Sequence, residues 1–154
     1  MRIRPFRRED IPAAARLFRE TILTVNRRDY SGAACRAWAA GAEEEATWAA
    51  SFAGHAAFAA EERGVLLGFG DIRPDGYVDR LFVHAGRQGE GIGTALLAAL
   101  AGAVPARPLR TEASLTARPF FLARGWRVVR RQTVERRGIR LVNFVMETEK
   151  EDSL

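Results

Sequence analysis

The segment RQGEGIGTALL (residues 87–97) has the residue types of an anion-binding turn. Gly89, Gly91 and Gly93 alternate immediately before an apolar run that is typical of a helix. A helix that begins here has free amide groups in its first turn, and its dipole adds partial positive charge. Because glycine lacks a Cβ, a phosphate can come close to these amides. The segment therefore predicts a phosphate site, with a tight turn of no chemical role as the alternative.

Two common nucleotide-binding motifs do not fit this segment. A P-loop requires a lysine between its last glycine and the Ser or Thr, whereas Gly93 is followed directly by Thr94. A Rossmann fingerprint opens a parallel βαβ unit, whereas the strands expected before residue 85 form an antiparallel meander. The residue types also give little support to other chemistries. His55, His84 and Cys35 lack the spacing of metal ligands, and no G-x-S-x-G motif is present, so we expect neither a metal site nor a serine hydrolase.

The composition is that of one globular domain. The 154 residues are 47% hydrophobic and 28% charged, and no apolar stretch is long enough to span a bilayer. The lone cysteine and the absence of a secretory signal favour a cytoplasmic location. We expect a single domain over residues 1–148 and a frayed tail over residues 149–154.

The net charge of +5 is carried almost entirely by arginine, since Lys150 is the only lysine. Arginine suits phosphate and carboxylate groups, so an anionic ligand or nucleic acid is a plausible partner. Most of the arginines are interleaved with acids, which is typical of a solvated surface. The segment RRQTVERRGIR (residues 130–140) could contact a ligand phosphate, nucleic acid or solvent. It lacks interleaved aromatic residues that would stack on bases, so we expect a solvated hairpin.

The hydrophobic periodicity predicts an α+β domain with the order β-α-α-β-β-β-α-β-α-β-β. Ser31 is placed to cap the second helix, a short helical stretch follows in EEEATWAASF, and WRVVRRQTV and IRLVNFVME form a hairpin. The expected sheet is mixed and mostly antiparallel, with about seven strands, and is flanked by about four helices. In the strand YVDRLFVH (residues 77–84), strict alternation would place Tyr77, Asp79, Leu81 and Val83 on one face.

Two motifs in this framework resemble those of the GNAT superfamily of GCN5-related N-acetyltransferases. Gln88-x-x-Gly91-x-Gly93, directly after LFVH, is similar to the family's pyrophosphate-binding motif Q/R-x-x-G-x-G/A. SLTARPFFLARGW (residues 114–126) is similar to its second motif, N-x-x-A-x-x-L/F-Y-x-x-x-G-F. The resemblance extends over residues 1–147 and includes the order of the elements. It implies the GNAT fold, acetyl-CoA as the acyl donor, and a pocket where the strands at 77–84 and 108–114 separate.

The resemblance also implies which residues bind the donor. The backbone of Leu81, Phe82 and Val83 would pair with the pantetheine arm, as an added strand does. The pyrophosphate would be held by backbone amides from one segment, namely Gln88, Gly89, Glu90, Gly91, Ile92, Gly93 and Thr94. Phe121 lies where the family often has the tyrosine that protonates the departing thiolate. A phenylalanine has no proton to give, so it would only stack near the cofactor.

Candidate catalytic residues follow from the same resemblance. Asp79 is the first choice for the general base, because carboxylates on this strand often have that role in the family; the alternative is an ion pair with a neighbouring arginine. Glu112 is the second choice, with a solvated strand residue as the alternative. Either carboxylate would need burial or a water relay to deprotonate an ammonium group. Tyr30, in the loop expected to shape the acceptor site, could contact the substrate or donate a proton, or it could be a packed aromatic residue of that loop. Ser114 replaces the family's asparagine and could place a hydroxyl near the thiol or cap the helix expected at Leu115.

The expected activity is transfer of an acetyl group from acetyl-CoA to a primary amine of a small molecule, by direct attack in a ternary complex. Two alternatives remain open: an acyl-CoA sensor without catalysis, suggested by Phe121, and a basic nucleic-acid-binding module. Nucleic acid is not the expected partner, and no membrane association is expected. The resemblance is compatible with a homodimer.

Overall fold

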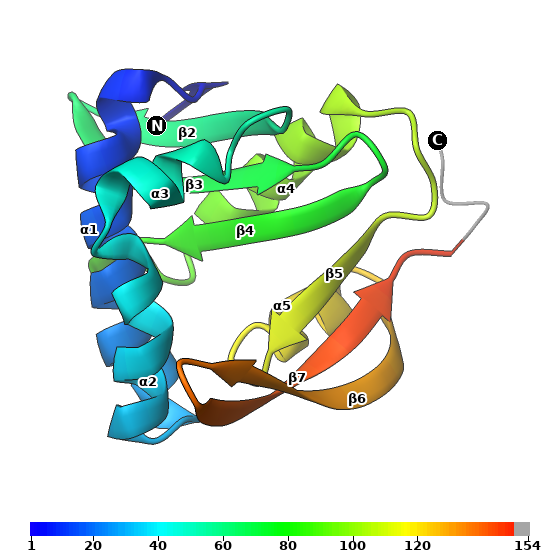
Figure 1. Ribbon diagram of the computed structural model, residues 1–154. Helices are drawn as coiled ribbons and strands as arrows, with labels where there is room; N and C mark the ends of the chain where they lie inside the picture. Colours follow the sequence, from blue (N-terminus) through cyan, green and yellow to red (C-terminus); the bar gives the residue numbers. More distant parts are fainter. Residues whose placement is uncertain (150–154) are drawn as a thin grey trace.

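The computed structural model describes residues 1–149, in which seven strands form one mixed sheet (Figure 1). The order across the sheet is β1-β2-β3-β4-β5-β7-β6, and every neighbouring pair is antiparallel except β4 and β5. The strands are β1 (Arg2–Pro5), β2 (Ala56–Glu62), β3 (Val65–Ile72), β4 (Tyr77–Val83), β5 (Arg110–Ser114), β6 (Arg127–Arg136) and β7 (Ile139–Glu147). The predicted mixed, mostly antiparallel α+β sheet is confirmed. The expected frayed tail lies, apart from its first residue, outside the described residues.

Within residues 1–149 there are five α-helices, one more than the expected order contains. They are α1 (Ile11–Thr24), α2 (Gly32–Ala39), α3 (Glu45–Ala50), α4 (Ile92–Ala103) and α5 (Arg118–Ala123). The additional helix is α3, which the short 3-10 turn Ala40–Ala42 separates from α2. Helices α1, α2 and α3 lie on one face of the sheet, and α4 and α5 lie on the other (Figure 1). No helix among the described residues is long and apolar enough to cross a membrane.

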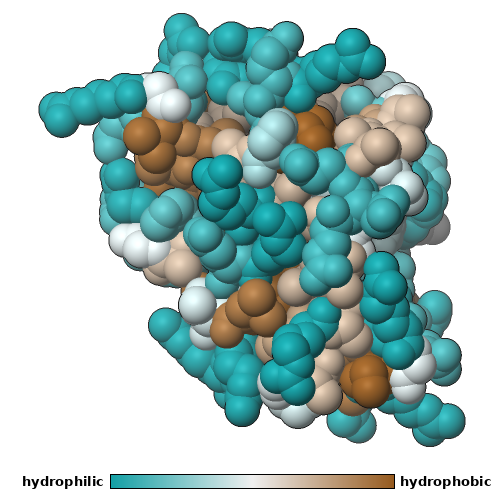
Figure 2. Space-filling view, turned by 60° about the vertical axis from the view of Figure 1, so that its left-hand side comes forward, coloured by the Kyte–Doolittle hydropathy of each residue, from teal (hydrophilic) through white to brown (hydrophobic). Residues whose placement is uncertain are grey.

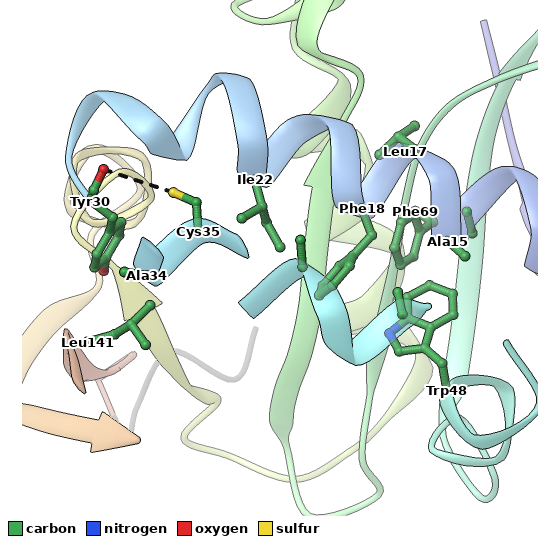
Figure 3. Packing of buried hydrophobic residues seen from close by; sticks show 13 residues of the cluster. Ala15, Leu17, Phe18, Ile22, Tyr30, Ala34, Cys35, Trp48, Phe69 and Leu141 are labelled. Atoms are coloured by element: carbon green, nitrogen blue, oxygen red, sulfur yellow. Dashed lines mark hydrogen bonds between the residues drawn. The ribbon is translucent and has the colours of Figure 1, made fainter. Parts of the chain in front are cut away.

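Strand β3 shows how the two faces are packed. A Cβ at Gly68 would lie 3.1 Å from Leu96 of α4, and a Cβ at Gly70 would lie 3.0 Å from Leu100 of the same helix. The two glycines therefore let α4 approach the sheet closely. Phe69, between them, points to the opposite face, where it is fully buried in the cluster beneath α1 and α3 (Figure 3). Alternation along a single strand thus builds both cores.

A β-bulge interrupts the alternation of β4. Arg80 pairs with Asp71 and Val78 pairs with Ile72, so Asp79 has no partner on β3. The Asp79 carboxylate lies 3.4 Å from the guanidinium of Arg80, which packs on the α3 side of the sheet against the ring of Phe52. Leu81, in contrast, packs with the α4 side. The expectation that Asp79 shares a face with Leu81 and Val83 was therefore wrong, because the extra residue of a bulge shifts the alternation.

Candidate functional site

A cavity of about 440 Å³ opens where β4 and β5 separate. The two strands pair only at Tyr77–Arg110 and Val78–Thr111. Beyond this point β5 stays paired with β7 and β4 stays paired with β3. The cavity is lined from one face of the sheet by residues of α1 and α2, including Phe18 and Trp38, and from the other by Gln88, Gly93 and Phe120. It therefore extends to both faces of the sheet.

On the α4 side, the predicted anion turn has the required backbone. Gly89 has φ 75° and Gly91, the N-cap of α4, has φ 85°, a left-handed conformation that favours glycine. A Cβ at either position would meet open space, so an incoming group would find no obstacle there. In the described part of the chain, no amide from Gly89 to Thr94 donates a hydrogen bond to another protein group. These amides and the helix dipole form a site suited to an anion.

The third glycine has a different role from the first two. A Cβ on Gly93 would lie 3.1 Å from the ring of Phe120, so this glycine makes room for the aromatic side chain of α5. The guanidinium of Arg124 lies 3.7 Å from the centre of the same ring and donates to Thr94 Oγ1 at 2.9 Å. A cation therefore lies beside the start of α4. Sequence reasoning missed Arg124, because nothing in its surroundings distinguishes it from the other arginines.

The side chains of the turn mainly hold the turn itself. Gln88 donates from Nε2 to the carbonyl oxygen of Val83 at 2.8 Å, and that oxygen also accepts from the hydroxyl of Thr21 at 3.1 Å. Glu90 pairs with Arg87 at 2.8 Å and so turns away from the amides. Both lone pairs of the Val83 carbonyl are therefore in use. The backbone of Leu81 and Phe82 borders the cavity and pairs with β3 on its other side.

At the centre of the cavity, Asp79 belongs to a charged cluster. Burial raises the pKa of its carboxyl group, and Arg80, which contacts it, opposes this shift. Asp71 is fully buried and receives two hydrogen bonds from Arg80, at 2.9 and 2.7 Å, and one contact from His55 Nδ1 at 2.7 Å. His55, Asp71 and Asp79 offer ligand atoms within 4.8 Å of one another. The guanidinium of Arg80 already provides the positive charge that these carboxylates require, so the group is best described as an ion-pair network.

Glu112 of β5 also borders the cavity, but both its carboxylate oxygens accept hydrogen bonds. The hydroxyl of Tyr77 donates to Oε2 at 2.9 Å, and the side-chain amide of Gln132 donates to Oε1. Burial, followed by the hydrogen bond to Glu112, raises the pKa of Tyr77, so its proton remains on the phenol. Asp79 accepts fewer hydrogen bonds than Glu112 does, and burial raises the pKa of the Asp79 carboxyl group.

Tyr30 and Ser114 both border the cavity, and both hydroxyls are used by the backbone. The Tyr30 hydroxyl donates to the carbonyl oxygen of Val142 at 2.5 Å and accepts from the amide of Leu115 at 2.8 Å. Burial raises its pKa. Ser114 Oγ accepts from the amide of Ala117 at 3.0 Å, in the turn before α5. That helix begins at Arg118 rather than at Leu115.

Phe121 is almost fully buried, with 3% of its surface exposed, and the centre of its ring lies 4.8 Å from that of Trp126.

A residue that sequence reasoning missed lies on β7. Asn143 is 8% exposed and borders the cavity, and its side-chain oxygen has no hydrogen-bond partner among the described residues. The available signal was a single amide inside the otherwise apolar stretch LVNFVM. Buried polar atoms are normally paired, so Asn143 is an exception that requires an explanation.

Comparisons with known proteins agree with this geometry. A family model described as an acetyltransferase (GNAT) domain matches residues 26–148. The "Uncharacterized N-acetyltransferase YafP" of Escherichia coli K12 is 30% identical over 146 residues, which cover 95% of this chain and 94% of that protein. A Rhodopseudomonas palustris crystal structure described as "GCN5-Related N-acetyltransferase: Aminotransferase, Class-II" superimposes with a TM-score of 0.91 at 36% identity, over 96% of this chain and 94% of the other. The PaiA N-acetyltransferase of Thermoplasma acidophilum, solved with coenzyme A, shares the fold at 16% identity, with a TM-score of 0.75 over 96% of this chain and 98% of the other. The chain therefore belongs to the GNAT family of acetyltransferases.

Proposed function

We propose that the protein transfers an acetyl group from acetyl-CoA to the primary amine of a small molecule, by direct attack within a ternary complex. The observation that carries this proposal is the cavity between β4 and β5, which is open to the free amides of α4 on one face and to α1 and α2 on the other. Two substrates can therefore meet at its centre without exchanging places. The PaiA relative was solved with coenzyme A, and the YncA structure from Salmonella typhimurium, which shares the fold at 18% identity, was solved with acetyl-CoA.

The α4 side would bind the donor. The amides from Gln88 to Thr94 would hold the pyrophosphate, with Arg124 adding a positive charge beside them. The pantetheine arm would lie along the β4 edge that β5 leaves free, as an added strand does. Because the Val83 carbonyl already accepts two hydrogen bonds, the backbone groups of Leu81 and Phe82 would carry most of this pairing.

Acyl transfer replaces the thioester C–S bond by a C–N bond, so the amine must lose a proton and the thiolate leaves. Asp79 would accept that proton, directly or through a water molecule, because its raised pKa makes it a better base than an exposed aspartate. Glu112 would have a supporting role through its hydrogen bonds with Tyr77 and Gln132. Phe121 cannot protonate the thiolate. A coenzyme A thiolate is a fairly good leaving group, so turnover does not require a protein acid at this position.

The experiment is a thermal-shift titration with coenzyme A thioesters, followed by measurement of thiol release with acetyl-CoA and a panel of amines. We expect saturable stabilisation by acetyl-CoA and amine-dependent release of the thiol. Stabilisation without release, across varied amines and acyl donors, would contradict the transferase activity. The absence of any response to coenzyme A would also contradict the donor site.

A second candidate function is an acyl-CoA sensor without catalysis. The observation that favours it is Phe121, whose buried ring fills the position of the family's tyrosine acid. This function predicts saturable binding of acyl-CoA with no turnover in the native chain. It also predicts that Phe121→Tyr produces measurable thiol release, whereas an active native enzyme predicts that this variant changes an existing rate.

A further inference from the structure

The side chain of Asn143 points to a ligand that the donor site does not explain. Its oxygen is buried without a partner, although Asn143 lies in the middle of β7, opposite Ser114 on β5 and Gln132 on β6. An amide oxygen that is buried without a hydrogen-bond partner lowers the stability of the folded chain. The residue borders the cavity, so a ligand there can supply the missing hydrogen bond.

The hairpin of β6 and β7 adds positive charge to the same cavity. Arg136 and Arg137, at its turn, border the cavity, whereas Arg131 and Arg140 of the same hairpin do not. Neither Arg136 nor Arg137 forms an ion pair with a carboxylate among the described residues. Arg136 donates instead to the backbone carbonyl of Glu135, and Arg137 donates to that of Ala40. A hairpin that contacts only solvent, as the sequence predicted, does not explain why two guanidinium groups without an ion-pair partner among the described residues border a cavity.

Between the amide and the arginines the cavity wall is apolar. Val134 and Leu141 are paired across β6 and β7, and both border the cavity together with Trp38 of α2. Leu141 is two residues from Asn143 along β7, and Ile139, the partner of Arg136, is two residues further. At about 3.4 Å per residue, the amide and the hairpin turn are about 14 Å apart along the strand, a distance that the long arginine side chains can shorten.

The charged side chains around the cavity are unevenly distributed. The carboxylates Asp79 and Glu112 lie on β4 and β5, where Arg80 also borders the cavity but is paired with Asp71 and Asp79. The uncharged amide of Asn143 follows on β7, and two arginines without an ion-pair partner among the described residues lie at the hairpin turn. Such an arrangement orients a molecule that is cationic at one end and anionic at the other. Arginine in particular fits carboxylate and phosphate groups with two hydrogen bonds.

We propose that the acceptor is an amine that also carries a carboxylate or phosphate group. The amine of the acceptor faces Asp79, and the body of the acceptor contacts Asn143 within the cavity. Arg136 and Arg137 bind its anionic group. This inference rests on the proposed function, because it assigns the acceptor of that reaction. The phosphates of the donor would be held separately, at the start of α4, which lies on the other face of the sheet (Figure 1).

The test compares acceptors that differ in the anionic group: leucine against leucinamide, and O-phosphoethanolamine against ethanolamine. Thiol release gives kcat/KM for each, and calorimetry in the presence of coenzyme A gives each dissociation constant. We expect at least one anionic member to exceed its uncharged partner by tenfold or more. The double variant Arg136→Gln/Arg137→Gln should lower that ratio about tenfold, or about 1.4 kcal/mol. The matched control Arg131→Gln/Arg140→Gln should preserve the ratio.

Asn143→Leu separates a ligand contact from a structural role. The substitution removes the unpaired amide at similar volume, so we expect the free protein to unfold at a higher temperature while the KM for the anionic acceptor rises about tenfold. A lower unfolding temperature with an unchanged KM would assign Asn143 to the fold alone and contradict its role here.

Other outcomes overturn the inference while leaving the proposed function intact. One such outcome is a kcat/KM for the uncharged members that equals or exceeds that of the anionic members. Another is that Arg136→Gln/Arg137→Gln weakens the binding of coenzyme A and has no other effect. If no amine releases thiol, the proposed function fails, and calorimetry with the same acceptor pairs still decides whether the cavity prefers the anionic members.

Discussion

The hydroxyl of Thr111 on β5 donates to the carbonyl oxygen of Val78 on β4 at 2.8 Å, at the last pair that holds these strands together. The next residue of β4 is Asp79, the bulged residue. The hydrogen bond, the bulge and the opening of the cavity thus coincide within two residues of β4. The candidate base therefore lies directly after the point where β4 and β5 separate.

Replacing Thr111 by valine tests this junction. Thr111→Val keeps the shape of the side chain but leaves the buried Val78 carbonyl without its side-chain donor, so we expect a loss of about 1–2 kcal/mol in the free energy of unfolding. Chemical denaturation measures it. The matched control is Thr133→Val on β6, where the side chain is exposed. Equal effects of the two substitutions would show that the junction does not depend on this hydrogen bond.

Gly91→Val tests the anion turn. A valine at φ 85° is strained and would extend over the free amides at the start of α4, so we expect coenzyme A to bind at least about tenfold more weakly. Calorimetric titration with coenzyme A gives the affinity. Gly102→Val, near the other end of α4, is the control, because Gly102 has open space and no positive φ. Unchanged affinity in Gly91→Val would place the pyrophosphate elsewhere.

Gly93→Ala tests the contact between α4 and α5. The new methyl group would lie 3.1 Å from the ring of Phe120, so we expect a loss of about 1–3 kcal/mol in stability. Phe120→Leu in the same chain should recover part of that loss, because the smaller side chain makes room. Thermal and chemical unfolding of the single and double variants measure the coupling. Additive effects would contradict a direct contact.

The sequence was sufficient for the order of the strands and for the glycine turn before α4, because both depend on local patterns. Gly89 and Gly91 both have a positive φ, a backbone conformation that favours glycine. Their spacing before an apolar run was enough to indicate such a turn. Gly93 belongs to the same motif, yet its role depends on Phe120, which is remote in sequence. The second motif was likewise recognised from its spacing, but the position of Phe121 in the core became visible only in three dimensions.

The part of the cavity that is proposed to bind the acceptor was less predictable, since its residues come from separate elements. Asp79 was named as a candidate from the resemblance, but the alternation rule placed it on the wrong face, because a bulge is a property of the pairing between two strands. Asn143 and Arg136 each look ordinary in the sequence. Their significance depends on their both bordering one cavity, which the pairing of β7 with β5 and with β6 creates.

Tyr30→Phe separates a structural hydroxyl from a catalytic one. The hydroxyl bridges the amide of Leu115 and the carbonyl of Val142, so its removal should cost about 1–3 kcal/mol of stability. The pH dependence of kcat should keep its shape, because this phenol has both its hydrogen bonds within the protein. A change in that shape, with stability intact, would instead assign Tyr30 a proton-transfer role.

Asp79→Asn is expected to have opposite effects on activity and on stability. Burial raises the pKa of Asp79 in the folded chain above its unfolded value, so ionisation disfavours folding as the pH rises between the two values. The asparagine variant should therefore be more stable than the native chain at pH 7, and this gain should vanish below about pH 4, where the aspartate is protonated in both states. Loss of the base should lower kcat about 100-fold and remove the acidic limb of the pH–rate profile.

The control for Asp79→Asn is Asp75→Asn. Asp75 lies outside the cavity, and its pKa is lowered, chiefly by the hydrogen bond from the Arg73 side chain. Ionisation of Asp75 therefore has the opposite effect on stability from ionisation of Asp79: the Asp75 carboxylate favours folding above its unfolded pKa. Asp75→Asn should lower stability at pH 7 and leave the pH–rate profile unchanged. Unfolding temperatures at pH 4 and pH 7, together with thiol-release rates over the same range, measure both effects. An acidic limb that persists in Asp79→Asn would exclude this carboxylate as the base and direct attention to Glu112, whose two oxygens already accept hydrogen bonds.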